Sequence, residues 1–127
     1  MDPKPTRKRT WADKFRDAIR GVRCGVSGQS SFLVHGVATV LVLVAGTVLR
    51  VSQTEWCLLT LCITIVLTAE MFNSALELLA EAVDKEQNSV LGTALDVASG
   101  AVLVTVIGAV IVGVLVFVPH LWPLLIG

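Results

Sequence analysis

Charged residues are scarce in this chain of 127 residues, because only 16% are charged whereas 54% are hydrophobic. The low charge and the long apolar runs exclude intrinsic disorder beyond the first dozen residues. The chain is also too short for a protein-kinase-type catalytic domain or a TIM barrel, which need roughly 250 residues. We therefore expect a single small domain whose apolar surface is covered by a membrane.

Cysteine is rare as well. The three cysteines, Cys24, Cys57 and Cys62, are an odd number, and they have no His or Cys partner at the spacing of a metal site. We interpret them as small apolar packing residues. The basic N-terminus does not run into a short apolar core with a cleavage site, so we do not expect a signal peptide.

The N-terminal part of the chain has the pattern of an amphipathic helix. Apolar residues recur at steps of three and four over residues 11–26, and Arg16, Arg20 and Arg23 lie on the opposite side. Such a helix with a basic face is typical of an element that lies in the membrane interface. Residues 1–10 are polar, basic and contain proline, so we expect a flexible tail there.

Three apolar stretches are long enough to cross a membrane, which takes roughly 20 residues in a helix. They cover residues 32–50, 56–81 and 94–118. The polar turn between the first two stretches is short enough only for an antiparallel helical hairpin. Two prolines, Pro119 and Pro123, predict the end of the third span. The sequence therefore predicts an all-α membrane protein with an interfacial helix and three transmembrane helices.

The basic residues are distributed unevenly along the chain. Eight of the ten Lys and Arg residues precede residue 25. Because basic residues favour the cytoplasmic side of a membrane, we expect the N-terminus to be cytoplasmic. Three spans then place the C-terminus on the outer side.

Polar side chains interrupt the second span on one side. Glu70, Asn73 and Glu77 are three and four residues apart, which places them on one helix face. Carboxylates in a membrane helix are costly unless they face protein, water or a cation. Three interpretations are open from these residues: a polar seam in a helical oligomer, a pathway for protons or ions, or a catalytic site with oxygen ligands for a cation such as Mg²⁺.

A resemblance to a known family favours the third interpretation. The segment EMFNSALE at residues 70–77 resembles the signature E-x-x-N-(S/T)-A-x-E of small bacterial membrane lipid kinases, which are the diacylglycerol kinases and the related undecaprenol kinases. The segment ALDVASGAVL at residues 94–103 is similar to the family's A-K-D-x-(A/G)-(A/S)-(G/A)-A-V-L at the same distance. Residues 15–23 resemble the family's surface helix, and residues 32–35 resemble the F-R-x-H opening of its first span. The likeness covers residues 14–118.

The resemblance implies an ATP-dependent kinase of a membrane lipid alcohol, built as a homotrimer with active sites shared between subunits at the cytoplasmic interface. It implies that Glu70 takes the proton from the lipid hydroxyl, that Asn73 positions the substrate and the γ-phosphate, and that Glu77 holds Mg²⁺. The residues implied to contact the nucleotide or the metal in addition are Glu86, Asp96 and Gln29. The chain has no Walker A loop, so its phosphate site differs from that of P-loop enzymes.

The chain departs from the family pattern at positions where the family binds the nucleotide or its metal ion. Leu95 stands where the family usually has the Lys that neutralises phosphate charge, so Lys85 or an Arg of the surface helix, such as Arg23, is the candidate substitute. Gln29 stands where many members have Glu as a second metal ligand, and its amide oxygen still suits Mg²⁺. Asn88 stands where the family often has His.

We therefore expect phosphorylation of diacylglycerol to phosphatidic acid in the inner (plasma) membrane of a bacterium, with no nucleic-acid partner. The alternatives are an undecaprenol kinase, a non-catalytic trimeric scaffold that lost its phosphate-binding Lys, and a proton-conducting bundle. We interpret His35 as a polar packing residue near the membrane surface. Arg50 and Glu55 are expected to form a solvated outer turn.

Overall fold

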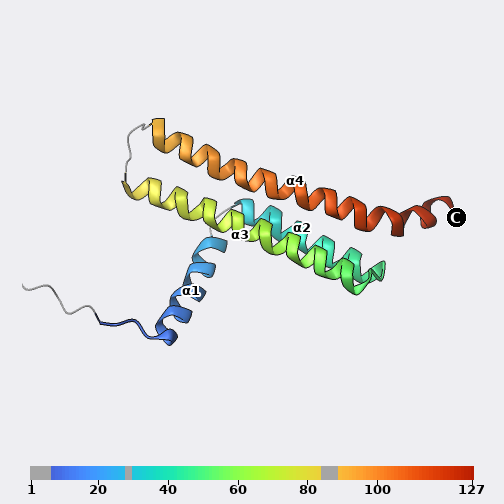
Figure 1. Cartoon of the computed structure of the whole chain (residues 1–127), viewed down its shortest axis with the longest axis horizontal. Helices are drawn as coiled ribbons and strands as arrows, with labels where there is room; N and C mark the ends of the chain where they lie inside the picture. Colours follow the sequence, from blue (N-terminus) through green and yellow to red (C-terminus); the bar gives the residue numbers. More distant parts are fainter. Residues whose placement is uncertain (1–6, 28–29, 84–88) are drawn as a thin grey trace, which may run out of the picture.

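A computed structural model describes residues 7–27, 30–83 and 89–127, and folds them into four α-helices. In chain order these are α1 (Trp11–Val26), α2 (Ser30–Val48), α3 (Gln53–Val83) and α4 (Ser89–Ile126). Helices α2 and α4 both pack along α3, whereas α1 lies at a steep angle to these three (Figure 1). The last three helices are long and apolar enough to cross a membrane. The prediction of an all-α, multi-pass membrane protein is confirmed.

Helix α1 begins with a capping box. Thr10 accepts a hydrogen bond from the Asp13 N–H through its hydroxyl, and the Asp13 carboxylate accepts one from the Thr10 N–H. This backbone hydrogen bond lowers the pKa of Asp13. The apolar residues of α1, among them Trp11 and Phe15, are exposed. An exposed apolar face opposite a basic one fits a helix that lies in the membrane interface.

The turn between α2 and α3 is built by backbone geometry. Arg50 has a positive φ of 54°, and the Val51 N–H donates to the carbonyl of Gly46, which is the pattern of a Schellman motif. The Trp56 ring lies against Gly46, where an added Cβ would come within 2.6 Å of the ring. Gly46 therefore permits the close approach of α2 and α3 at this end.

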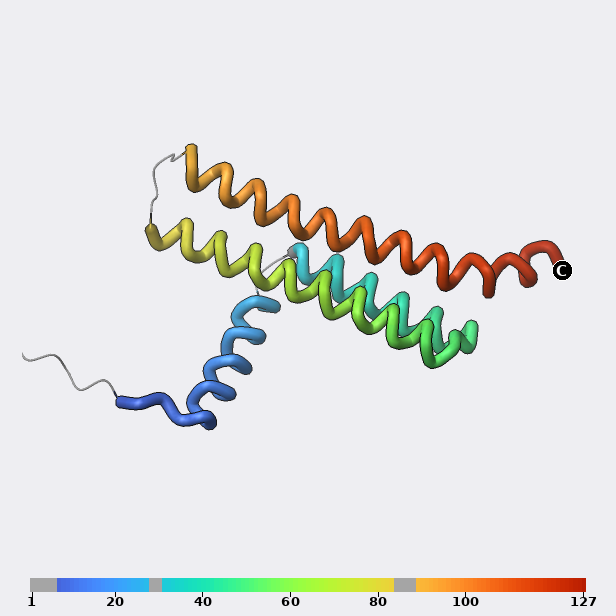
Figure 2. The backbone as a smooth tube through the Cα atoms, in the orientation of Figure 1, coloured from blue at the N-terminus to red at the C-terminus, as the bar shows by residue number. Residues whose placement is uncertain are grey.

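Helix α4 is longer than the sequence predicts, so the expectation that Pro119 and Pro123 end this helix is wrong. The helix continues to Ile126 with Pro119 and Pro123 inside it. The two prolines are four residues apart, so the hydrogen bonds that they remove lie on one side of the helix. The remaining sides stay bonded, and the Gly127 N–H donates to the Pro123 carbonyl. The backbone bends near this end (Figure 2).

The buried core of the single chain is small. Val51, Leu59 and Val116 form its centre, close to the turn between α2 and α3. Most large apolar side chains of the spans are exposed. In a membrane protein this surface is available to lipid tails or to further helices.

Helices α3 and α4 continue past the start of α2 toward their connection at residues 84–88 (Figure 1). The segment of α3 that carries Glu70, Asn73 and Glu77 therefore begins next to the first turns of α2 and extends past that end of α2. Helix α1 meets α3 in the same region, where Gly25 lies next to the Met71 side chain. The candidate functional site therefore lies at this end of the bundle.

Candidate functional site

Glu70 is the most deeply buried carboxylate of the described residues, with 3% of its surface exposed. Its Oε2 atom lies 3.3 Å from Nε2 of His35, which projects from α2. His35 is itself mostly covered, with 16% of its side chain exposed. Helical spacing in the sequence does not predict this contact, because the two residues are 35 positions apart and lie on different helices.

Asn73 and Glu77 continue the same face of α3 toward its C-terminal end. The Asn73 Nδ2 group donates a hydrogen bond of 3.0 Å to Oε1 of Glu77. On its other side, the Asn73 Oδ1 atom lies 3.5 Å from the hydroxyl of Ser99 on α4. The predicted shared face of Glu70, Asn73 and Glu77 is thus present, and Ser99 is a polar neighbour that the sequence did not single out.

Burial decreases along this face. Glu70 and Asn73 are buried, at 3% and 7% exposure, whereas Glu77 one turn later is exposed. A buried carboxylate beside apolar helices is suited to accept a proton from a group in the membrane. An exposed carboxylate is suited to bind a cation that arrives from water.

The other predicted site residues are less closely joined to this face. Asp96 is exposed on α4, three residues before Ser99, and Leu95 beside it is partly buried. Arg23 is exposed in the last turn of α1 and forms no ion pair with Glu70. Gln29, Lys85, Glu86 and Asn88 lie outside the described residues.

Glu77 is the one proposed metal ligand within the described residues. Among those residues no group of three or more His, Cys, Asp or Glu side chains could hold a metal ion by itself. Glu77 by itself is an exposed carboxylate, which is the kind of oxygen ligand with which Mg²⁺ is commonly bound together with substrate phosphates and water.

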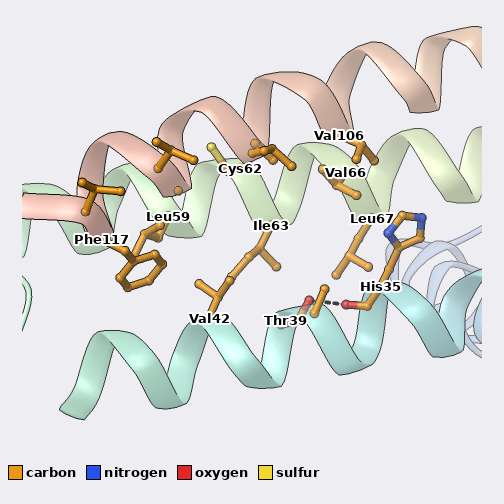
Figure 3. A pocket seen from close by; sticks show the side chains of 16 residues that line it. His35, Thr39, Val42, Leu59, Cys62, Ile63, Val66, Leu67, Val106 and Phe117 are labelled. Atoms are coloured by element: carbon orange, nitrogen blue, oxygen red, sulfur yellow. Dashed lines mark hydrogen bonds between the residues drawn. The ribbon is translucent and has the colours of Figure 1, made fainter. Parts of the chain in front are cut away.

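An apolar groove of about 430 Å³ begins at the polar face and runs between α2, α3 and α4. Figure 3 shows His35 and Thr39 at one end of it, while Val42, Leu59 and Phe117 line the other end. The groove therefore leads along the bundle from apolar surroundings to the side chain that contacts Glu70. No pattern in the sequence predicts this groove, because its lining comes from three helices.

The opposite end of the bundle carries a second contact between His and Glu. His120 Nε2 lies 3.0 Å from Oε2 of Glu55, and the Glu55 carboxylate also accepts a hydrogen bond from the Ser52 N–H. The interpretation of Glu55 as part of a solvated turn is wrong, because its side chain caps α3 and joins it to α4. Glu55 is 15 positions before Glu70, so this contact belongs to the turn and not to the candidate site.

Three apolar helices with a polar face at one end define a small multi-pass membrane protein whose candidate site combines a buried and an exposed carboxylate. The family model described as prokaryotic diacylglycerol kinase matches residues 16–117. The chain belongs to this family, and the resemblance inferred from its motifs is confirmed. It is thus a membrane lipid kinase, a phosphotransferase of a family that uses ATP.

Individual relatives agree with this assignment. A diacylglycerol kinase of Synechocystis sp. is 32% identical over 130 residues, covering 97% of this chain and 74% of the relative. An undecaprenol kinase of Bacillus subtilis is 30% identical, covering 84% of this chain and 87% of the relative. A diacylglycerol kinase of Escherichia coli is 33% identical, covering 72% and 75%. The relatives thus carry the names of two different lipid kinases.

Proposed function

We propose that this protein transfers the γ-phosphoryl group of ATP to the hydroxyl of diacylglycerol and forms phosphatidic acid. The observation that carries the proposal is the gradient of burial from Glu70 to Glu77 on one face of α3. A kinase of a membrane lipid must bring a hydroxyl from an apolar phase to a charged nucleotide from water. A face with a buried carboxylate at one end and an exposed carboxylate at the other meets both requirements.

Glu70 acts as the general base in the proposed reaction. It accepts the proton of the lipid hydroxyl while the hydroxyl oxygen forms a bond to the γ-phosphorus, and the bond to the β,γ-bridging oxygen of ATP breaks. The products are the phosphorylated lipid and ADP. A positioned base contributes typically 10²–10⁴-fold to a rate, and the remainder comes from orientation and charge neutralisation.

Asn73 and Glu77 position the nucleotide end of the site. Glu77 would hold Mg²⁺ together with phosphate oxygens, and Gln29 would supply a further oxygen ligand. A cation held there would supply positive charge to neutralise the transferring phosphoryl group. The hydrogen bond from Asn73 to Glu77 fixes the orientation of that carboxylate, and Asp96 and Glu86 contact the nucleotide from α4 and the connection before it.

We further propose that the chain acts as a homotrimer whose sites are shared between subunits. The exposed apolar surfaces of α2, α3 and α4 support this, because a single chain buries few of their large side chains.

A panel of lipids tests the reaction and its substrate. The purified protein in micelles, with ATP and Mg²⁺, is expected to phosphorylate diacylglycerol faster than undecaprenol at equal mole fraction. Preference for undecaprenol would support the second candidate, which the relative from Bacillus subtilis favours. Trimers that phosphorylate no lipid would instead support a non-catalytic scaffold.

The N-terminal basic residues give a prediction for topology. Eight Lys and Arg residues before residue 25 favour a cytoplasmic N-terminus, and three spans would then put the C-terminus outside. A topology reporter fused after Gly127 is expected to report a periplasmic or extracellular location, and the same reporter at the N-terminus a cytoplasmic one. A cytoplasmic result at both ends would contradict three crossings.

Leu95 gives a prediction for ATP binding. A basic group that is hydrogen-bonded to phosphate contributes about 1.5–3 kcal/mol. Leu95→Lys is therefore expected to lower the KM for ATP by roughly tenfold or more without changing the KM for the lipid. Val97→Lys is the matched control, because it adds the same charge on the other side of Asp96. Equal effects of both substitutions would indicate a general electrostatic attraction instead of a specific phosphate contact.

A further inference from the structure

His35 and Glu70 come from different helices, and both are largely shielded. Nε2 of His35 lies 3.3 Å from Oε2 of Glu70, with 16% and 4% of the two side chains exposed. Among the described residues, His35 provides the ion-pair contact of the Glu70 carboxyl. A charged carboxylate in such apolar surroundings needs a partner of this kind to remain ionised at low cost.

The position of His35 is determined by the packing of α2 on α3. Three further residues of α2, Ala38, Thr39 and Val42, lie at helical spacing after His35 and line the groove between α2, α3 and α4. This face of α2 is therefore the one that packs toward α3, and it directs the His35 ring there. Figure 3 shows the ring at the end of the apolar groove, beside Leu67 of α3.

We propose that His35 is a positioning residue for the phosphoryl transfer, because it holds the carboxylate of Glu70 by one oxygen and leaves the other oxygen to the lipid hydroxyl. The proposal rests on the function proposed above, in which Glu70 is the base. The imidazole suits this role, since Nε2 is the ring atom that faces the carboxylate and it can donate an N–H to it. The effect of His35 on the reaction is therefore exerted through Glu70 and not through the nucleotide.

A purely structural role is the alternative, and the chain contains a matched case of it. His120 and Glu55 form a contact of the same chemistry, at 3.0 Å, between α4 and the start of α3. That contact lies at the turn between α2 and α3, at the other end of α3 from Asn73 and Glu77. Loss of a contact that only joins helices is expected to change stability and to leave the catalytic step unaffected.

The test compares His35→Gln, His35→Leu and His120→Leu with the wild-type protein in lipid kinase assays. His35→Leu is expected to lower kcat about 10- to 100-fold, with the KM values for ATP and lipid within about twofold of wild type. His35→Gln retains an N–H at the reach of Nε2 and is expected to restore kcat to within about threefold. His120→Leu is expected to keep kcat and to lower only the Tm.

The outcomes separate this inference from the proposed function. A fully active His35→Leu protein, or equal losses in the Leu and Gln variants, overturns the role of His35 and leaves the lipid kinase reaction in place. A wild-type protein that phosphorylates no lipid overturns both. If His35→Leu does not fold in micelles, His35→Asn takes its place, because the shorter amide is polar but does not reach Glu70. A normal kcat in His35→Asn then overturns the inference.

Discussion

Glu70→Gln is expected to lower kcat by about 10²–10⁴-fold, which is the range for loss of a positioned general base. The amide has the shape of the carboxyl group, so the contact surface with α2 is kept while the ability to accept the hydroxyl proton is lost. The KM for ATP is expected to change little, because Glu70 and Glu77 are seven residues, or roughly 10 Å, apart along α3. The measurement is steady-state lipid phosphorylation at saturating ATP, with ATP binding measured separately.

Glu55→Gln is the matched control for this experiment. It makes the same substitution in the other carboxylate of α3 that contacts a histidine. Because Glu55 also accepts a hydrogen bond from the Ser52 N–H, the control is expected to lower stability while kcat at saturating substrate is kept. Similar losses of kcat in both variants would show that the defect comes from packing, and the assignment of Glu70 as the base would then be wrong.

The helical periodicity of the sequence is sufficient to predict much of the fold and one face of the candidate site. The spacing of Glu70, Asn73 and Glu77 predicted their common face, because residues three and four apart on a helix are neighbours. The structure agrees, since Asn73 donates a hydrogen bond to Glu77. The apolar runs likewise predicted the three spans, because their length is set by the thickness of a bilayer.

Contacts between helices were not predictable in this way. The sequence alone favours a polar packing residue at His35, because the contact with Glu70 depends on how α2 packs on α3. It likewise favours a solvated turn at Glu55, because only the packing of α4 brings His120 to this carboxylate. Pro119 and Pro123 do not end α4, because a helix with apolar surroundings continues when its missing hydrogen bonds lie on one side.

The second large effect is expected at the exposed end of the same face. Glu77→Gln is expected to raise the Mg²⁺ concentration for half-maximal activity by about tenfold or more, because loss of a charged oxygen ligand weakens binding of a hard cation. At saturating Mg²⁺ much of the kcat is expected to return, which distinguishes this variant from Glu70→Gln. The measurement is the initial rate of lipid phosphorylation as a function of free Mg²⁺ at fixed ATP.

Glu81→Gln separates a specific ligand from a general attraction of cations. Glu81 is exposed on α3 one turn beyond Glu77, so its substitution removes the same charge from the same end of the helix. If Glu77 binds the cation directly, the Mg²⁺ dependence shifts in Glu77→Gln and not in Glu81→Gln. Equal shifts would mean that both acids act through the surface potential. No shift in either variant would place the metal on other ligands. In that case the hydrogen bond from Asn73 would orient Glu77 for a role other than metal binding.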